Sequence, residues 1–166
     1  MAAFVFTSKT ILMGTAWTGT APGAPGTQTI SGTITSTSDF SPYLTGADPG
    51  YSTEMKPTTD MASGGYTEVI PGLTSGDDIV LAINADFAAS QVWSIIKTTL
   101  GGLSRAGSSP VYIDIKPTSS ARGATNPSFV AAVLLMAWKP LQGNVGDLAT
   151  MGLTCKVTGA FADLTS

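Results

Sequence analysis

The sequence predicts a single, mainly β domain, and three of its features support that prediction. Apolar and polar residues alternate over Val111–Lys116 and over Thr150–Thr158, which is the pattern of strands with one buried face. Glycine and proline interrupt the chain often, as they do in folds built from strands and turns. Only 11% of the 166 residues are charged whereas 43% are hydrophobic, so the chain has enough apolar residues to bury a core.

The length and the charge of the chain favour a subunit that assembles with copies of itself. A chain of 166 residues corresponds to one domain, spanning 1–166, that needs no disulfide or metal to be stable. A surface with so few ions is poorly protected against self-association. The formal net charge of −3 and the scattered basic residues argue against binding of nucleic acid through its phosphates.

Neither an intrachain disulfide nor a membrane-spanning segment is expected. Cys155 is the single cysteine, and we interpret it as a small buried hydrophobic residue. The longest apolar run, Phe129–Trp138, is about half as long as a transmembrane helix must be. No basic region precedes the apolar residues at the N-terminus, so a signal peptide is not expected either.

Short strands are expected along much of the chain. Residues 1–10 are a candidate N-terminal arm, and residues 159–166 are expected to form a short C-terminal tail. Ala2–Phe6 and Ile11–Trp17 are each expected as an arm or an edge strand. The other expected strands are Thr27–Thr37, Tyr66–Ile70 with a Pro71–Gly72 turn after it, Ile79–Ile83, Val111–Ile115, Phe129–Trp138 and Met151–Val157.

The last two of these strands are expected to pair as a hairpin. The turn between them contains Gly143, Gly146 and Asp147, which are residue types that tight turns favour. Phe129–Trp138 is apolar on both faces, so we expect it to lie centrally in the sheet or against another subunit.

One helix is predicted, over about Phe87–Leu100. Apolar residues recur there at helical spacing, which predicts one apolar stripe that packs on a sheet. Asp86 is the expected N-cap, and Gly101 follows the expected C-terminus. The residues of the stripe are Ala89, Val92, Trp93, Ile96 and Leu100.

A long loop is predicted over about Ser38–Gly65, because prolines and glycines break every periodic pattern there. Loops of this length in compact domains usually either bind something or lack order. Five of its residues are too apolar for a simple linker, so we expect them at a subunit interface with a neighbouring copy; a mobile surface loop is the alternative. These candidate interface residues are Tyr43, Leu44, Tyr51, Met55 and Met61.

The sequence predicts no catalytic residue, no cofactor and no metal. It contains no histidine, which excludes the Ser-His-Asp and Cys-His arrangements and histidine-containing zinc sites. Ser94 and Lys97 have the S-x-x-K spacing of penicillin-recognising enzymes, but the accompanying motifs are absent and we interpret the pair as the solvent face of the helix. Asp77 and Asp78 are adjacent, which favours a solvated turn over a pair of catalytic carboxylates.

Two stretches of the chain resemble signature regions of the tail tube (major tail) proteins of siphophages. The first runs over Met61–Gly76 and continues into the strand after it, up to Asp86-Phe87. The second begins with Asn126-Pro127-Ser128-Phe129, continues through Pro140-Leu141 and Gly146–Thr150, and ends with Val157–Ala160. Their order and spacing together carry the resemblance, which covers most of the second half of the chain.

The resemblance implies a β-sandwich or barrel-like fold with a flanking helix, and a structural role in the virion. Such subunits join side by side into hexameric rings, and the rings stack into a hollow tube that delivers the genome. The long loop would bridge to an adjacent ring, so deleting Tyr43–Met61 is expected to leave the domain folded and to abolish stacking. The expected partners are further copies of the chain, the tape measure, tail terminator and distal tail proteins, and DNA that passes without specific binding.

The resemblance also implies synthesis in the cytoplasm of the host bacterium and no association with membranes. Two other functions remain open from the sequence. Another virion component, such as a tail terminator or a capsid decoration protein, would share the composition and the symmetry. A secreted glycan-binding sandwich would fit the abundance of threonine and serine, although no signal peptide is expected.

Overall fold

The computed structural model describes residues 10–22, 30–57, 69–99 and 110–164, which form two antiparallel sheets and one short helical segment. The larger sheet has the strand order β2-β1-β7-β8-β9-β6-β3, and β4 pairs with β5 in a separate hairpin. The strands are β1 Thr10–Thr18, β2 Thr33–Asp39, β3 Leu44–Asp48, β4 Tyr51–Pro57, β5 Val69–Gly76, β6 Ile79–Asn84, β7 Val111–Lys116, β8 Ser128–Gln142 and β9 Thr150–Leu164.

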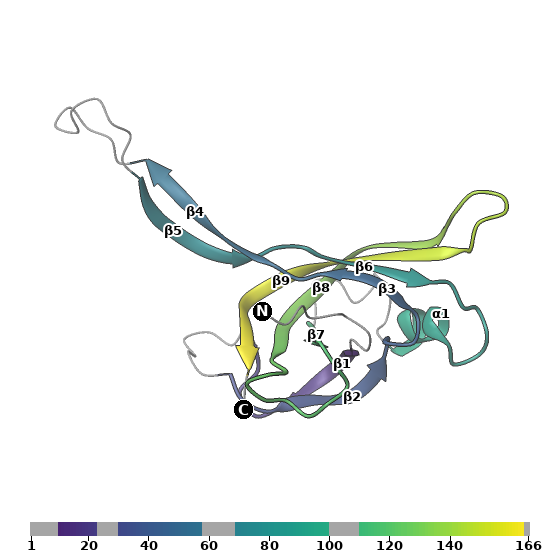
Figure 1. The fold of residues 1–166 in the computed structure, drawn as a ribbon, viewed down its shortest axis with the longest axis horizontal. Coiled ribbons are helices and arrows are strands. Elements are labelled where there is room, and N and C mark those ends of the chain that lie inside the picture. Colours follow the sequence, from purple (N-terminus) through teal and green to yellow (C-terminus); the bar gives the residue numbers. More distant parts are fainter. Residues whose placement is uncertain (1–9, 23–29, 58–68, 100–109, 165–166) are drawn as a thin grey trace.

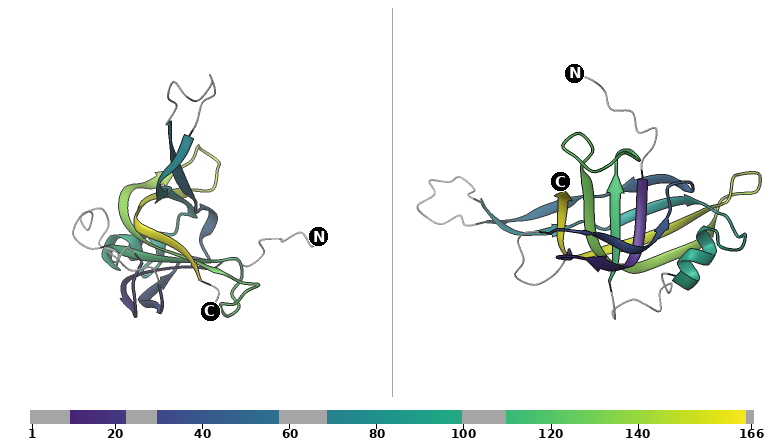
Figure 2. Two further views of the ribbon diagram at one scale, coloured as in Figure 1. Left: turned by 90° about the vertical axis from the view of Figure 1, so that its left-hand side faces the viewer. Right: turned by 90° about the horizontal axis from the view of Figure 1, so that it is seen from below.

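The larger sheet curls around the core because its two longest strands bend. β8 and β9 have 15 residues each, and their pairing shifts register at three places. Such bulges bend a strand pair and increase its twist. As a result, β1 and β2 lie across the core from β3 and β6 (Figures 1 and 2). The predicted mainly β, barrel-like architecture is confirmed, and its two layers belong to one continuous sheet.

Alternation along the strands decides which side chains enter the core. In β6, Ile79, Leu81 and Ile83 are fully buried, whereas Val80 and Ala82 between them are exposed. β8 lies between β7 and β9, as its apolar run predicts, and it pairs with β9 in the predicted hairpin. The remaining fully buried large side chains of the core are Ile11, Met13, Phe40, Ile96, Ile113, Leu135, Met151 and Leu153.

The helical segment is shorter than predicted and begins later. It consists of α1, Val92–Ser94, followed by η1, Ile95–Thr99, a π-helical turn. Asp86 was the wrong N-cap: its carboxylate accepts the N–H of Ala88 at 2.9 Å, and this local turn competes with the helix. Ser90 has a φ of 64°, which also prevents a helix from starting at Phe87. The predicted apolar stripe packs on the core in part: Val92 and Ile96 are buried and Trp93 packs against the core cluster, whereas Ala89 is exposed and Leu100 lies outside the described residues.

The predicted loop over Ser38–Gly65 was wrong for its first two thirds. β3 and β4 lie within it, and Pro49 and Gly50 separate these two strands instead of ending regular structure. The turn predicted at Pro71–Gly72 was also wrong, because β5 runs through it. Pro71 lies opposite Met55 where the register shifts, and such an irregularity in a two-stranded ribbon tolerates the missing N–H of proline.

The predicted bounds or roles of three further segments differ from the structure. Ile11–Trp17 lies in β1, which pairs with β2 and β7 and is therefore an interior strand. The strand predicted at Thr27–Thr37 begins at Thr33, and the predicted tail 159–166 continues β9 as far as Leu164. The candidate arm 1–10 and Ala2–Phe6 lie outside the described residues, apart from Thr10, which begins β1.

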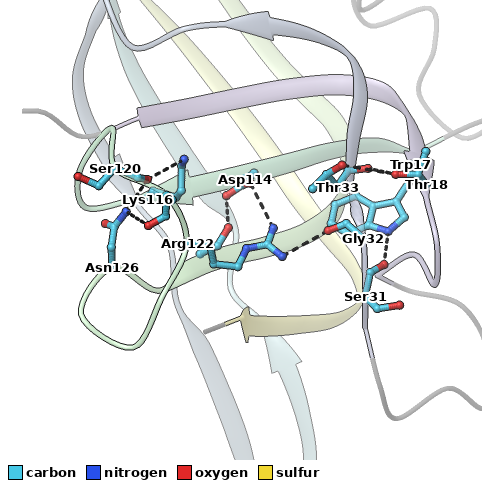
Figure 3. Close-up of polar contacts among 12 residues, drawn as sticks. Trp17, Thr18, Ser31, Gly32, Thr33, Asp114, Lys116, Ser120, Arg122 and Asn126 are labelled. Atoms are coloured by element: carbon cyan, nitrogen blue, oxygen red, sulfur yellow. Dashed lines mark hydrogen bonds and ion pairs between the residues drawn. The ribbon is translucent and has the colours of Figure 1, made fainter. Parts of the chain in front are cut away.

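A polar cluster holds the connection between β7 and β8 against Gly32, the residue before β2 (Figure 3). Asp114 is 7% exposed, and its carboxylate accepts the hydroxyl of fully buried Ser128. The guanidinium of Arg122 lies 3.7 Å from the same carboxylate and donates to the carbonyl of Gly32 at 3.3 Å. Asn126 closes the connection on itself, because its amide accepts the N–H of Thr118 and donates to backbone carbonyls nearby. The cluster thereby fixes one end of the curled sheet.

We predict that Asp114→Ala destabilises the domain by about 3 kcal/mol, because it leaves the guanidinium of Arg122 without its carboxylate in a largely buried site. Urea unfolding followed by tryptophan fluorescence measures this loss. Glu54→Ala is the matched control: it removes a carboxylate from an exposed pair with Lys56, and its effect should stay within about 0.5 kcal/mol. Equal unfolding midpoints for the two variants would show that the cluster contributes no stability.

Candidate assembly surfaces

Two of the five predicted interface residues, Tyr43 and Leu44, pack inside the subunit. Both are half-buried against the core cluster, and the hydroxyl of Tyr43 donates to the side-chain oxygen of Gln91. Tyr43 also accepts the N–H of Asn84 through its carbonyl at 2.7 Å. The side chain of Tyr43 therefore reaches Gln91, just before the helical segment, its carbonyl binds β6, and both side chains pack against the subunit's own core.

The β4–β5 hairpin projects from the body of the domain (Figures 1 and 2). Its exposed apolar side chains include Met55, 61% exposed, and Val69, 54% exposed. Tyr51 begins β4 at the base of the hairpin, opposite Gly76, and Met61 lies outside the described residues. Met55 is thus the predicted interface residue that the structure places on an exposed, projecting element.

A second hairpin, between β8 and β9, projects at the opposite end of the longest axis (Figure 1). Gly143 and Gly146 have φ values of 140° and 97°, which favour glycine, and the carboxylate of Asp147 accepts the backbone N–H of Asn144. The three predicted turn residues therefore all lie in this turn. Its exposed apolar side chains, which were not among the predicted interface residues, are Leu141, Val145 and Leu148.

Strands β3, β6, β9 and β8 lie side by side in this order, and we call them the four-stranded section. This section has an unpaired edge on each side. Among the described residues, β3 pairs with β6 alone. β7 pairs with β8 only up to Val133, so β8 from Leu134 onward has β9 as its one described neighbour. β2 is also an outer strand, but Ser36 interrupts it with a φ of 55°. The two edges of the four-stranded section are irregular in places, because the register of β3 shifts between Leu44 and Gly46 and that of β8 shifts between Lys139 and Gln142, around Pro140. Unpaired edges are nevertheless templates for pairing with another chain.

The exposed face of the four-stranded section lies opposite the core and carries balanced charges. Asp48 on β3 and Lys139 on β8 are exposed, and each follows a residue that packs against the core. Between them, the ammonium of Lys156 on β9 lies 2.8 Å from the carboxylate of Asp78, which directly precedes β6. The two acidic and two basic residues leave this face without net charge.

The described residues contain no group of three or more side chains that could hold a metal ion. The suggested Ser94–Lys97 pair is not arranged as a nucleophile and base, because the ammonium of Lys97 lies 4.7 Å from the ring centroid of Trp93. Asp77 and Asp78 lie exposed in the turn between β5 and β6, as predicted, and bind Ser52 and Lys156 respectively. No helix in the described ranges is long and apolar enough to span a membrane.

Comparisons with known proteins identify the fold. No protein-family model matches the chain, and no curated protein does. A chain of the anti-feeding prophage baseplate superposes with a TM-score of 0.61 at 11% identity, over 99% of this chain and 97% of that one. A chain of the SPP1 tail tube gives 0.58 at 8% identity, over 99% and 80%. A chain of the tail of an empty gene transfer agent particle, determined with C6 symmetry, gives 0.52 at 13% identity, over 74% and 83%. The chain therefore has the tail tube fold that its resemblance implied.

We predict that Cys155 is chemically inert in the folded protein. The side chain is fully buried, and this desolvation raises the pKa of its thiol from 9.0 to about 12. A thiol reagent should therefore react negligibly between pH 7 and about 10 and stoichiometrically once denaturant is added. Because the unfolded thiol ionises first, raising the pH from about 9 towards about 12 also favours unfolding. Rapid labelling of the native protein at pH 8 would contradict the buried placement.

Proposed function

We propose that this chain is a structural tail protein of a long-tailed bacteriophage or a related particle, and that it assembles as hexameric rings stacked into a hollow tube. The main support for this proposal is the pair of unpaired edges on the two sides of the four-stranded section. Similarity in fold to the SPP1 tail tube and to the C6-symmetric gene transfer agent tail supports the choice of assembly. The whole chain, 1–166, would act as one tail tube domain without catalytic activity.

Ring closure follows from the directions of the strands. Each neighbouring pair in the four-stranded section is antiparallel, so β3 runs opposite to β8. A copy placed beside another with its β3 next to the distal part of β8 would continue the same antiparallel sheet. Every copy would then lose both unpaired edges, which a closed ring achieves and an open chain does not.

The exposed face of the four-stranded section would line the channel, because the rest of the domain packs on the other face and would lie outside the ring. Its charges cancel, and Lys156 is already neutralised by Asp78. A polyanion passing through such a channel meets no cluster of unpaired cations. We therefore propose that genomic DNA passes without specific binding.

The β4–β5 hairpin would contact the adjacent ring, because it projects from the body and exposes Met55 and Val69. The rings at the two ends of the tube would contact the tail terminator and distal tail proteins, and the tape measure protein would occupy the channel before DNA. The chain would be made in the host cytoplasm and would end in the virion.

Negative-stain microscopy of concentrated purified protein tests the proposed assembly. We expect six-fold rings and tubes of stacked rings. Closed rings that never stack would favour a tail terminator instead. Persistent monomers at every salt and protein concentration would count against both virion functions.

We predict that shortening the β4–β5 hairpin abolishes stacking and preserves the ring. Replacing Glu54–Leu73 by an Asn-Gly turn would join Thr53 to its cross-strand neighbour Thr74 without disturbing the larger sheet. The replacement is a better test than deleting Tyr43–Met61. That deletion would remove β3 and two side chains that pack on the core, so it would not leave the domain intact. Circular dichroism should show an unchanged cooperative unfolding transition, and micrographs should show rings without tubes.

A milder variant, Met55→Ser with Val69→Ser, keeps the hairpin and removes its exposed apolar side chains. It should raise the protein concentration at which tubes form. Tubes of normal length from the shortened variant would disprove the role of the hairpin in stacking.

A further inference from the structure

Charge is distributed unevenly across the exposed face of the four-stranded section. Asp48 lies on β3 at one edge, and Lys139 lies on β8 at the other. Both side chains are exposed, and neither forms an ion pair with another described residue, in contrast to Asp78 and Lys156 between them. One edge is therefore acidic and the other is basic.

We propose that Asp48 of one copy forms an ion pair with Lys139 of the next copy, and that this pair sets the direction of ring closure. The inference rests on the proposed ring and identifies the contact that orients it. Opposite charges at the two edges favour the encounter of one edge with the other and disfavour each edge meeting itself.

The alternative to a ring is a two-fold dimer, in which an edge pairs with the same edge of a second copy. A β3-to-β3 contact would join two acidic edges, and a β8-to-β8 contact would join two basic edges. Like charges across an interface penalise the wrong arrangement. The head-to-tail contact alone joins an acidic edge to a basic one.

The registers of the strands bring the two residues to similar heights. Asp48 pairs with Val80, which pairs with Thr154. Lys139 pairs with Gly152, which precedes Thr154 by two residues on β9. The two charges thus differ by one step of about 7 Å along the strands. The long, flexible stem of lysine spans part of this offset, and the stagger between neighbouring strands of a closed barrel adjusts the rest.

Charge reversal tests the pairing. Asp48→Lys and Lys139→Asp should each lower the yield of rings and tubes at least tenfold at a fixed protein concentration, measured by sedimentation and counted in micrographs. The variant that carries both changes should recover most of the wild-type yield, because the pair is restored with its polarity reversed. Lys97→Asp is the matched control: it makes the same change of charge on the helical segment and should assemble as the wild type does.

Disulfide cross-linking tests proximity directly. Within one copy, β3 and β8 are separated by β6 and β9, or about 14 Å, which is twice the greatest Cα separation of about 7 Å that a disulfide allows. Ala137 lies at the height of Asp48, because it pairs with Thr154, which pairs with Val80 opposite Asp48. Oxidised Asp48→Cys, Ala137→Cys double-variant protein should therefore give a ladder up to hexamers on a non-reducing gel. Each single variant should stay monomeric on the gel, and the buried Cys155 should not interfere.

The outcomes separate this inference from the proposed function. If the wild type forms no rings, the proposed function fails. If the wild type forms rings, and the single charge reversals assemble normally or the double reversal is not rescued, the ion pair is wrong while the ring stands. Cross-linked dimers from either single cysteine variant would overturn the head-to-tail direction.

Discussion

The pairing of β8 with β9 is the interaction on which the rest of the structure depends. The N-terminal part of β8 pairs with β7 on its other side, and the N-terminal part of β9 pairs with β6. Because these neighbours attach to opposite ends of the long pair, the bulges between them can turn one half of the sheet over the other. The core fills the space between the halves. The same offset leaves β8 beyond Val133 with no second strand among the described residues, so the feature that builds the core also creates an edge of the proposed assembly.

The sequence was sufficient to predict those strands that bury one face or both faces in the core. β6, β7, β8 and β9 were all predicted near their observed positions, because burial in the core imposes alternation or a continuous apolar run. It was insufficient for β3, β4 and β5, where prolines and glycines pointed to loops and turns. β4 and β5 pair as a ribbon outside the larger sheet, so burial there imposes no alternating pattern. The start of the helix was missed because Asp86 could cap a helix or close a local turn, and the sequence does not decide between them.

The positions of the candidate interface residues within the fold were harder to predict, for a different reason. Apolar residues in the segment 38–65 suggested contact with a neighbour, but Tyr43 and Leu44 complete the core of their own subunit. The two unpaired edges could not be found in the sequence, because an edge is defined by which strands do not meet. That information depends on the register and on the order of strands, which are long-range properties. Leu141, Val145 and Leu148 flank a glycine-containing turn in the sequence, and apolar residues around such a turn are a signal for exposed apolar side chains at a hairpin end.

The low charge of the chain acquires a physical reason in the proposed assembly. A surface that identical copies cover cannot hold many ions, since each ion removed from water needs a partner of opposite charge. On the exposed face of the four-stranded section, Asp78 and Lys156 neutralise each other within the subunit. Asp48 and Lys139 lie at the edges, where a neighbouring copy is the partner within reach in a ring. The positions of Asp48 and Lys139, more than the net charge of the chain, therefore determine which edge of one copy meets which edge of the next in the proposed ring. Exchanging the two edge residues would keep the net charge of −3 and the pairing, whereas reversing either one alone would set like charges against each other at every contact in the ring.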